Sequence, residues 1–489
     1  MLPALAGSAW LASNVPGYLR FRRALARPEA VQRSLLRRYL KDNADTAFGR
    51  AHGFAAIRSA EEYRERVPTA HWEDMAPWVN RIAAGEANVL TRSPVRTLEP
   101  TSGSSAAAKL IPYTAALQRE IRRAVAPWIV DLYGRRPRLA LGSAYWSITP
   151  LALDEERPGG QVRVGFEEDS QYLGGLWSRL VDATLAVPGS VRHLRDPDAF
   201  RQATLQHLLR RRDLTVISVW HPSFLLLLME PLPRLSPEPP GRIWPRLGLI
   251  SCWGDAHAAL SLPELARAFP GVEIQPKGLL ATEGFVTIPF AGRWPLAIRS
   301  HFFEFLPEDG GGPRFAWELE EGGIYSVALT TGGGLYRYRL QDRVRVEGSV
   351  ERTPSLRFLG KEGHVSDLRG EKLHESFVAG VLARVFEKAE MVPRFAMLAP
   401  AGDAGYVLFL ETDAPPPDLA ARLDNELAAN PQYRLCRALG QLAPVRVQPV
   451  GLGAYGRYLE ECRRRGQRWG DVKPLALSPL DGWGEVLET

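Results

Sequence analysis

Apolar residues follow two different spacings along this chain. Helical spacing runs over residues 31–41 and 117–132, and it returns over 199–211 and 262–268. Short apolar runs of strand length stand among the later helices, at 214–219, 247–251, 272–275 and 286–289. Helices that alternate with short apolar strands are typical of a sheet covered by helices. The pattern therefore predicts an α/β fold.

The predicted secondary structure changes twice in the later part of the chain. Residues 292–347 contain strand-like runs separated by glycines, which predict a small β-rich subdomain. A polar stretch at 351–355 then precedes a block in which two helical patterns mix with two strands. We therefore predict a large N-terminal domain of α/β subdomains with a small β-rich subdomain, residues 1–355. A smaller, mobile α+β domain is predicted over residues 356–489.

Composition narrows the class of protein. A chain of 489 residues with 45% hydrophobic and 24% charged residues is typical of a globular protein of two or three packed units. It contains no apolar run of membrane-spanning length. Three cysteines are too few for a disulfide framework, which favours a reducing, cytoplasmic location. The net charge is +6, but the basic runs lack interleaved aromatic residues, so we predict no nucleic-acid partner.

Lysine is rare among the basic residues. Of 61 lysines and arginines, only seven are lysines, at positions 41, 109, 277, 361, 372, 388 and 473. Arginine offers a planar fork, whereas lysine offers a compact ammonium group. In a chain that otherwise uses arginine, a lysine indicates a position where the compact ammonium group is needed.

The first candidate motif is the small-residue segment 99–109. Its hydroxyl side chains are Thr101, Ser102, Ser104 and Ser105. Gly103 permits a tight turn, Lys109 adds a cation, and a helix follows soon after. Hydroxyls, backbone amides and an ammonium group together can cradle a phosphate. The segment lacks the Gly-Lys-Ser/Thr ending of a Walker A loop, and a flexible surface turn remains the alternative.

The second candidate motif is the segment 277–284, which follows an apolar strand. It contains Thr282 and Glu283, flanked by small residues. A carboxylate in this position can hold Mg²⁺ against a nucleotide phosphate. The alternative for Glu283 is a solvated turn residue.

The third candidate motif is the segment 330–342. Three glycines open a strand in which tyrosines alternate with arginines, and the strand ends in Asp342. An aspartate can accept hydrogen bonds from both hydroxyls of a ribose. The alternative is a glycine-started hairpin with a half-buried aromatic face.

In this order and spacing, the three motifs resemble those of the adenylate-forming superfamily. The chain is more specifically similar to the Gretchen Hagen family of auxin-responsive acyl-acid amido synthetases, in their bacterial form. Further segments extend the resemblance over nearly the whole chain: NADTAFGRAHGF (43–54), VNRIAAGEANVL (79–90), FLGKEGHVSDLRGEKLHE (358–375) and RGQRWGDVKP (465–474).

The resemblance implies an ATP-dependent ligase. Such an enzyme forms an acyl-adenylate from a carboxylic acid and transfers the acyl group to an amine, with an amino acid as the expected amine. It implies ATP and Mg²⁺ as cofactors, with Glu283 on the metal and Lys109 and Lys473 as catalytic cations. The residues it assigns to ATP are Ser102, Gly103, Ser104, Ser105, Thr282, Asp342 and Lys361.

Several positions depart from the family pattern. The phosphate loop carries Ala106 and Ala107 where relatives often have glycine, and Gln341 replaces the usual glycine before Asp342. Lys361 replaces an expected arginine. Two alternatives stay open: a ligase that ends in a thioester with coenzyme A or a carrier protein, and a degenerate, non-catalytic nucleotide-binding member.

Overall fold

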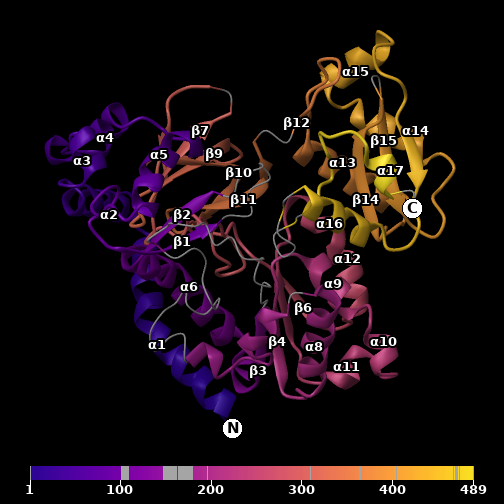
Figure 1. The fold of residues 1–489 in the computed structure, drawn as a ribbon, viewed down its shortest axis with the longest axis horizontal. Helices are drawn as coiled ribbons and strands as arrows, with labels where there is room; N and C mark the ends of the chain where they lie inside the picture. Colours follow the sequence, from indigo (N-terminus) through magenta and orange to yellow (C-terminus); the bar gives the residue numbers. More distant parts are fainter. Residues whose placement is uncertain are drawn as a thin grey trace. The chain divides into compact units, whose positions relative to one another are not determined.

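The chain divides into two compact units in its computed structural model (Figure 1). The structure describes residues 2–100, 109–146, 162, 180–194, 196–308, 310–362, 365–402, 405–465, 467, 472 and 474–487. The first unit comprises Met1–Trp220, Leu228–Cys252 and Val272–Phe358. The second unit comprises His221–Leu227, Trp253–Gly271 and Leu359–Thr489.

A four-stranded parallel sheet forms one part of the first unit. Its strands, in spatial order, are β3 (Ser143–Trp146), β4 (Leu214–Ser218), β5 (Leu249–Cys252) and β6 (Glu273–Pro276). The strands predicted at 214–219, 247–251 and 272–275 are thereby confirmed. The run at 286–289 is not a strand of this sheet, because Thr287 forms a single antiparallel bridge with Leu296. Pro289 has no amide hydrogen with which a ladder could continue.

A five-stranded sheet confirms the predicted β-rich subdomain. Its strands lie in the order β11-β10-β9-β7-β8, and β7 to β10 pair antiparallel. Their bounds are β7 (Phe302–Pro307), β8 (Arg314–Phe315), β9 (Ile324–Thr330), β10 (Tyr338–Val350) and β11 (Thr353–Lys361). A separate hairpin pairs β1 (Val95–Pro100) with β2 (Leu110–Thr114).

Helices cover these sheets in the first unit. They are α1 (Leu2–Leu25), α2 (Pro28–Asp42), α3 (Ala47–Ala51), α4 (Ala60–Arg66), α5 (Trp72–Ala83), α6 (Ala115–Arg135), α8 (Pro197–Leu209), α10 (Leu232–Leu235) and α11 (Pro240–Ile243). Helix α6 begins where the Thr114 side chain accepts a hydrogen bond from the Leu117 amide, which caps the helix N-terminus. The helices predicted at 31–41, 117–132 and 199–211 correspond to α2, α6 and α8.

The second unit is α+β. Its sheet pairs β14 (Phe395–Pro400) antiparallel with β15 (Tyr406–Glu411), which pairs parallel with β16 (Arg446–Pro449). A two-stranded pair joins β12 (Val365–Ser366) to β13 (Leu373–His374). The helices are α12 (Leu262–Ala268), α13 (Glu375–Lys388), α14 (Leu419–Leu427), α15 (Pro431–Ala438), α16 (Ala454–Arg464) and α17 (Trp483–Leu487). Helix α9 (Pro222–Met229) begins in this unit.

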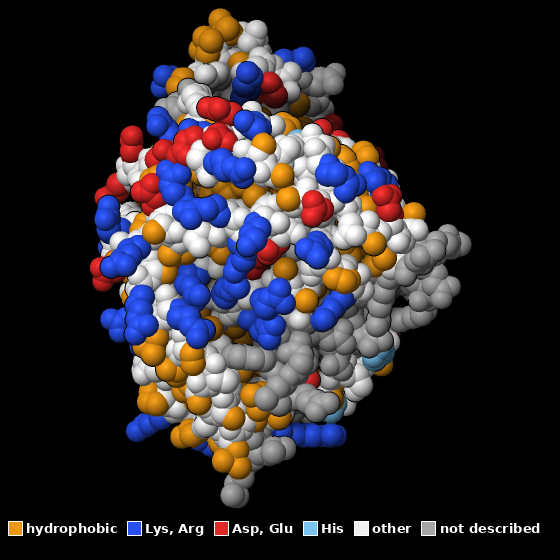
Figure 2. Space-filling model, turned by 90° about the vertical axis from the view of Figure 1, so that its left-hand side faces the viewer, with side chains coloured by type: hydrophobic (Ala, Val, Ile, Leu, Met, Phe, Trp, Pro, Cys, Tyr) orange, Lys and Arg blue, Asp and Glu red, His pale blue; other side chains and the backbone are white. Residues whose placement is uncertain are grey.

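Basic side chains spread across one face of the molecule, with acidic side chains among and above them (Figure 2). Ion pairs on the N-terminal helices are partly exposed. Arg33, for example, lies 2.9 Å from Glu29 and 2.7 Å from Glu61. Exposed pairs of this kind contribute little to stability. The three cysteines are buried and form no disulfide with one another.

A buried carboxyl group predicts a pH dependence of stability. Glu375, at the start of α13, accepts one hydrogen bond from the Ala476 amide at 3.2 Å, and its burial raises its pKa to about 7. In the unfolded chain this carboxyl group ionises near pH 4.5, so between about pH 4.5 and 7 only the folded state keeps the proton. The free energy of unfolding therefore decreases as the pH rises through this range. We expect Glu375→Gln to reduce that loss of unfolding free energy by about 2 kcal/mol.

Urea unfolding at pH 5 and pH 8 measures this effect. Glu387, exposed on the same helix, provides the control Glu387→Gln, which should leave the pH dependence unchanged. The same pH slope in wild type and Glu375→Gln would contradict the prediction.

Candidate nucleotide site

The glycine turn after β9 lies against β2 and α6. The Thr114 hydroxyl donates a hydrogen bond to the Gly332 carbonyl oxygen at 2.8 Å. A Cβ atom on Gly332 would lie 2.5 Å from Glu120 Oε1, and one on Gly333 would lie 2.7 Å from the Pro112 carbonyl oxygen. Only glycine permits so close an approach. Lys109 directly precedes β2, so the strand that follows the first motif contacts the glycines of the third motif at Pro112 and Thr114.

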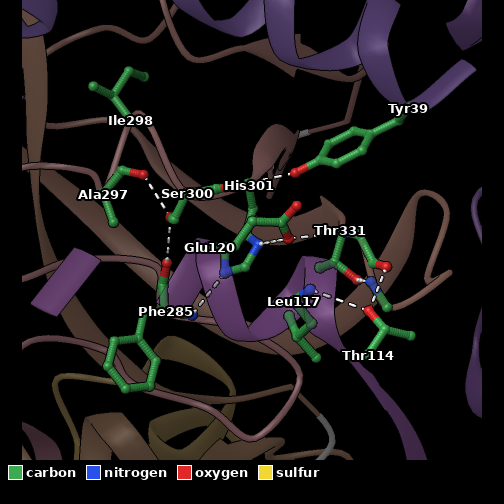
Figure 3. A network of polar contacts seen from close by, with 12 residues as sticks. Tyr39, Thr114, Leu117, Glu120, Phe285, Ala297, Ile298, Ser300, His301 and Thr331 are labelled. Atoms are coloured by element: carbon green, nitrogen blue, oxygen red, sulfur yellow. Dashed lines mark hydrogen bonds and ion pairs between the residues drawn. The ribbon is translucent and has the colours of Figure 1, made fainter. Parts of the chain in front are cut away.

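A buried glutamate and histidine join the second motif to the third (Figure 3). Glu120 is 2% exposed and His301 is fully buried. The Phe285 amide donates to His301 Nε2 at 3.2 Å, so the imidazole proton must lie on Nδ1. Nδ1 then donates to Glu120 Oε2 at 3.2 Å, and the Gly332 amide donates to the same oxygen at 2.9 Å. The Glu120 carboxylate of α6 thus bonds directly to the glycine turn and, through His301, to the turn that ends at Phe285.

The loop that carries His301 is itself fixed by hydrogen bonds. The Tyr39 hydroxyl of α2 donates to the Ser300 carbonyl oxygen at 3.1 Å. The Ser300 hydroxyl lies 2.6 Å from the Ala297 carbonyl oxygen and 3.3 Å from that of Phe285 (Figure 3). The imidazole ring therefore has a fixed position, which a rigid ligand site requires.

The second motif forms a tight turn. Leu280 and Phe285 bridge antiparallel, and the backbones of Ala281 and Gly284 exchange hydrogen bonds at 3.1 and 3.2 Å. Thr282 and Glu283 therefore occupy the tip of the turn, where both side chains are partly exposed. A partly exposed carboxylate at a turn tip remains accessible to a ligand.

Two of the predicted site residues lie around one tyrosine. Tyr338, in β10, is buried, and burial raises the pKa of its hydroxyl. The negative charges of Glu283, Glu73 and Asp342 raise that pKa further. Glu283 and Asp342 therefore lie within electrostatic range of the same hydroxyl group, although they are far apart in the sequence. Asp342 is 3% exposed.

Gln341 shows why glycine is usual before Asp342. Its φ is 61°, in the left-handed region, and the β9–β10 pairing shifts register between Arg339 and Arg343. Such a bulge favours glycine because any Cβ strains a left-handed backbone. Gln341, which replaces the usual glycine of the family, is therefore a strained residue beside Asp342, the predicted ribose ligand.

This strain predicts a stabilising substitution. We expect Gln341→Gly to raise the free energy of unfolding by about 0.5–1 kcal/mol, because relief of the left-handed strain outweighs the extra entropy of the unfolded chain. Urea unfolding measures the change. Gln341→Ala keeps the Cβ atom and should show no such gain. A less stable glycine variant would refute the argument.

The remaining predicted residues divide into two groups. Lys109 is half-buried just before β2, and Lys361 is the last residue of β11, in the second unit. Ser102, Gly103, Ser104, Ser105 and Lys473 lie outside the described residues. The ligand roles of all these residues stay predictions.

Glu120 and His301 were not predicted from the sequence. One signal for Glu120 was present: it lies on the apolar stripe of the predicted helix, between Leu117 and Ile121 and one turn before Ala124. A carboxylate on a buried helix face needs a partner. No local pattern identified that partner as His301, which comes much later in the chain.

Within the described part of the chain, no three His, Cys, Asp or Glu residues form a metal-binding group. Across those same residues, no helix has the length and apolar character needed to cross a membrane.

Sequence profiles of one family match most of the chain. The GH3 family N-terminal domain matches residues 18–235, its central domain 294–361 and its C-terminal domain 379–479. The indole-3-acetic acid-amido synthetase GH3.17 of Arabidopsis thaliana is 22% identical, covering 94% of this chain and 93% of that protein. The jasmonoyl–L-amino acid synthetase JAR6 of Nicotiana attenuata is 22% identical, covering 78% of each.

Solved structures show the same fold. The GH3.15 acyl acid amido synthetase superposes with a TM-score of 0.81 at 19% identity, covering 96% of this chain and 94% of that one. A 2-hydroxyisobutyryl-CoA ligase with bound 2-HIB-AMP superposes with a TM-score of 0.55 at 14% identity, covering 86% of each chain.

Proposed function

Because the chain belongs to the GH3 family, we propose that it is an acyl acid amido synthetase. It activates a carboxylic acid as the acyl-adenylate and then transfers the acyl group to an amine, with an amino acid as the expected amine. The observation that carries this proposal is a hydrogen-bonded link between the turns of the second and third motifs, together with the packing of the third motif against the strand that follows the first. The Glu120–His301 pair joins the turn of Glu283 to the glycine turn, which lies against the strand that follows Lys109.

The chemistry has two steps, and neither requires a covalent bond to the enzyme. First, a carboxylate oxygen attacks the α-phosphorus of ATP, and pyrophosphate leaves. Second, the amine nitrogen attacks the acyl carbon, loses a proton and expels AMP. Both partners of the first step are anions, so cations must offset the charge on the attacking and leaving groups.

The proposed roles follow the motifs. Asp342 accepts hydrogen bonds from the ribose hydroxyls, and Glu283, at the tip of its turn, binds Mg²⁺. Thr282 contacts the nucleotide beside it. Lys109, with the hydroxyl loop Ser102–Ser105, offsets charge on the phosphates.

We assign different roles in the reaction to the two predicted domains. Residues 1–355 bind ATP and the acid, and residues 356–489 act as a mobile cap. Lys361 lies where the cap begins, and Lys473 is the cation that the cap supplies. We place the protein in the cytoplasm, with small-molecule substrates as its partners.

A screen of carboxylic acids for acid-dependent pyrophosphate release tests the proposal. The panel includes indole-3-acetic acid and jasmonic acid, named for the acids of the similar plant enzymes. Products are then identified by mass with amino acids or with coenzyme A present. An amide supports the proposal, and a thioester indicates the coenzyme A reaction of the CoA ligase that shares the fold. ATP binding without turnover on any acid would indicate a non-catalytic protein.

A further inference from the structure

A row of side chains lies on one face of the parallel sheet near its carboxyl edge. Trp146 of β3 is in register with Ser218 of β4, which is in register with Ser251 of β5, and Ser251 with Gln275 of β6. Side chains in register on neighbouring parallel strands point to the same face. Trp128 of α6 covers this face, because its Nε1 donates to Gln275 Oε1 at 3.1 Å. Ligands of open α/β sheets bind at the carboxyl edge.

Two buried donors in this row have no acceptor. Neither the Ser218 hydroxyl nor Trp146 Nε1 has a hydrogen-bond partner among the described residues. Ser218 is 3% exposed, so water cannot easily replace the missing partner. An unpaired buried donor is costly and is uncommon unless a ligand uses it.

Lys277 brings a positive charge to the same place. It directly follows β6, is 4% exposed, and donates from Nζ to the Val219 carbonyl oxygen at 2.8 Å. Val219 is the residue after Ser218, so the ammonium group lies at the end of the strand that carries the unpaired hydroxyl. Nζ also lies 4.6 Å from the centre of the Trp220 ring.

The charge of Lys277 is poorly compensated within the described part of the chain. Its Nζ has three donors, and one is used by Val219, while no described carboxylate forms an ion pair with it. Burial lowers its pKa to about 7, and the nearby Cys252 opposes this shift. A buried ammonium without a carboxylate is expensive, and such groups mark functional sites.

We propose that Lys277, with the Ser218 hydroxyl and the Trp146 indole N–H, binds the carboxylate of the acid substrate. A carboxylate offers two oxygens with about four acceptor positions, which matches these donors. The rings of Trp146, Trp220 and Trp128 provide an apolar wall for the rest of the acid.

This inference rests on the proposed function, and the position of Lys277 suits it. The residue begins the segment that ends at the Glu283 turn, six positions before the proposed Mg²⁺ ligand. The ammonium also reduces repulsion between the attacking carboxylate and the phosphates. Arginine, which the chain otherwise prefers, would place a larger planar group in this buried position.

Carboxylate binding should be linked to protonation. Below about pH 7 the lysine of the free protein is already charged. Above that pH Lys277 is neutral in the free protein and must take up a proton when the carboxylate binds. The dissociation constant of the carboxylate should therefore rise by up to about tenfold for each pH unit. An uncharged amide of the same acid should show no such dependence.

A spectroscopic titration without ATP tests the binding site directly. The chain has only seven lysines, so selective [ε-¹³C]lysine labelling gives few resonances, and Lys277→Arg identifies that of Lys277. Acetate, benzoate, phenylacetate and indole-3-acetate are added, each against its own amide. At least one carboxylate should shift the Lys277 resonance and raise its titration midpoint by about one pH unit or more. No response to any carboxylate, or an equal response to the amides, would overturn the proposal.

Kinetics separate binding from a structural role. With an acid that releases pyrophosphate, Lys277→Met should raise the KM for the acid by about 10- to 100-fold while the KM for ATP stays constant. Ser218→Ala should cause a smaller rise. Lys388→Met, an exposed lysine of the second unit, is the control. Equal changes in both KM values would show that Lys277 only supports the fold. If no acid releases pyrophosphate, the proposed function fails, and the resonance titration still decides this inference.

Discussion

Asp342→Ala is expected to lower acid-dependent pyrophosphate exchange by about 100- to 10,000-fold. Asp342 lies in β10 and is almost wholly buried, within electrostatic range of Tyr338 together with Glu283. In the proposed site it accepts hydrogen bonds from both ribose hydroxyls, and each bond to a charged group contributes about 1.5–3 kcal/mol. Two such bonds correspond to the expected loss when converted at 1.4 kcal/mol per factor of ten.

Exchange of labelled pyrophosphate into ATP measures this effect, with the KM for ATP determined for each variant. Asp342→Asn keeps one acceptor oxygen and should retain more activity than the alanine variant. Asp413, an exposed aspartate paired with Arg394, supplies the control Asp413→Ala. Wild-type exchange in a folded Asp342→Ala protein would exclude the proposed ribose contact.

Glu304→Ala is expected to lower the free energy of unfolding by about 3–5 kcal/mol. Glu304 of β7 and Arg337 are both buried, and they form two parallel hydrogen bonds, at 2.8 Å from Nε and 2.9 Å from Nη2. Arg337 Nη1 also donates to the Arg64 carbonyl oxygen at 2.7 Å. Without Glu304, the guanidinium stays buried without a counter-charge, which costs more than the pair itself contributes.

Urea unfolding of the two single variants and of the double variant distinguishes this mechanism. Arg337→Met should also destabilise, because it leaves Glu304 buried alone. The double variant Glu304→Ala/Arg337→Met should lose less stability than the sum of the single losses, since no unpaired charge remains. Strictly additive losses would show that the two charges do not depend on each other.

The same pair positions the candidate site. Arg337 has a φ of 48°, and its backbone amide donates to the Thr330 hydroxyl at 3.0 Å. The next residue, Tyr338, begins β10, which carries Asp342. A loss of the ion pair should therefore raise the KM for ATP in protein that remains folded.

The local elements could be read from the sequence because each depends on nearby residues. The helix predicted at 117–132 lies within α6 (Ala115–Arg135), and the strand predicted at 214–219 is β4 (Leu214–Ser218). Apolar spacing marks the buried face of such elements directly. The three motifs were also visible, since each is a continuous segment with its own chemical composition.

The polar core of the site could not be read in this way. Glu120 and His301 are 181 positions apart, and their pairing depends on the packing of α6 against a loop. The left-handed backbone of Gln341 follows from a bulge in the β9–β10 pairing, which no local propensity encodes.

The sequence by itself determined the α/β class, the β-rich subdomain, several of the helices and strands, and the segments that carry the candidate chemistry. The tertiary structure alone decided that Glu120 joins two of those segments, that Asp342 and Glu283 lie near one tyrosine, and that Lys277 is buried without a described carboxylate. The physical reason is the distance along the sequence over which each interaction acts. Hydrophobic spacing and turn chemistry act over a few residues, whereas burial and charge pairing depend on which distant segments meet when the chain folds.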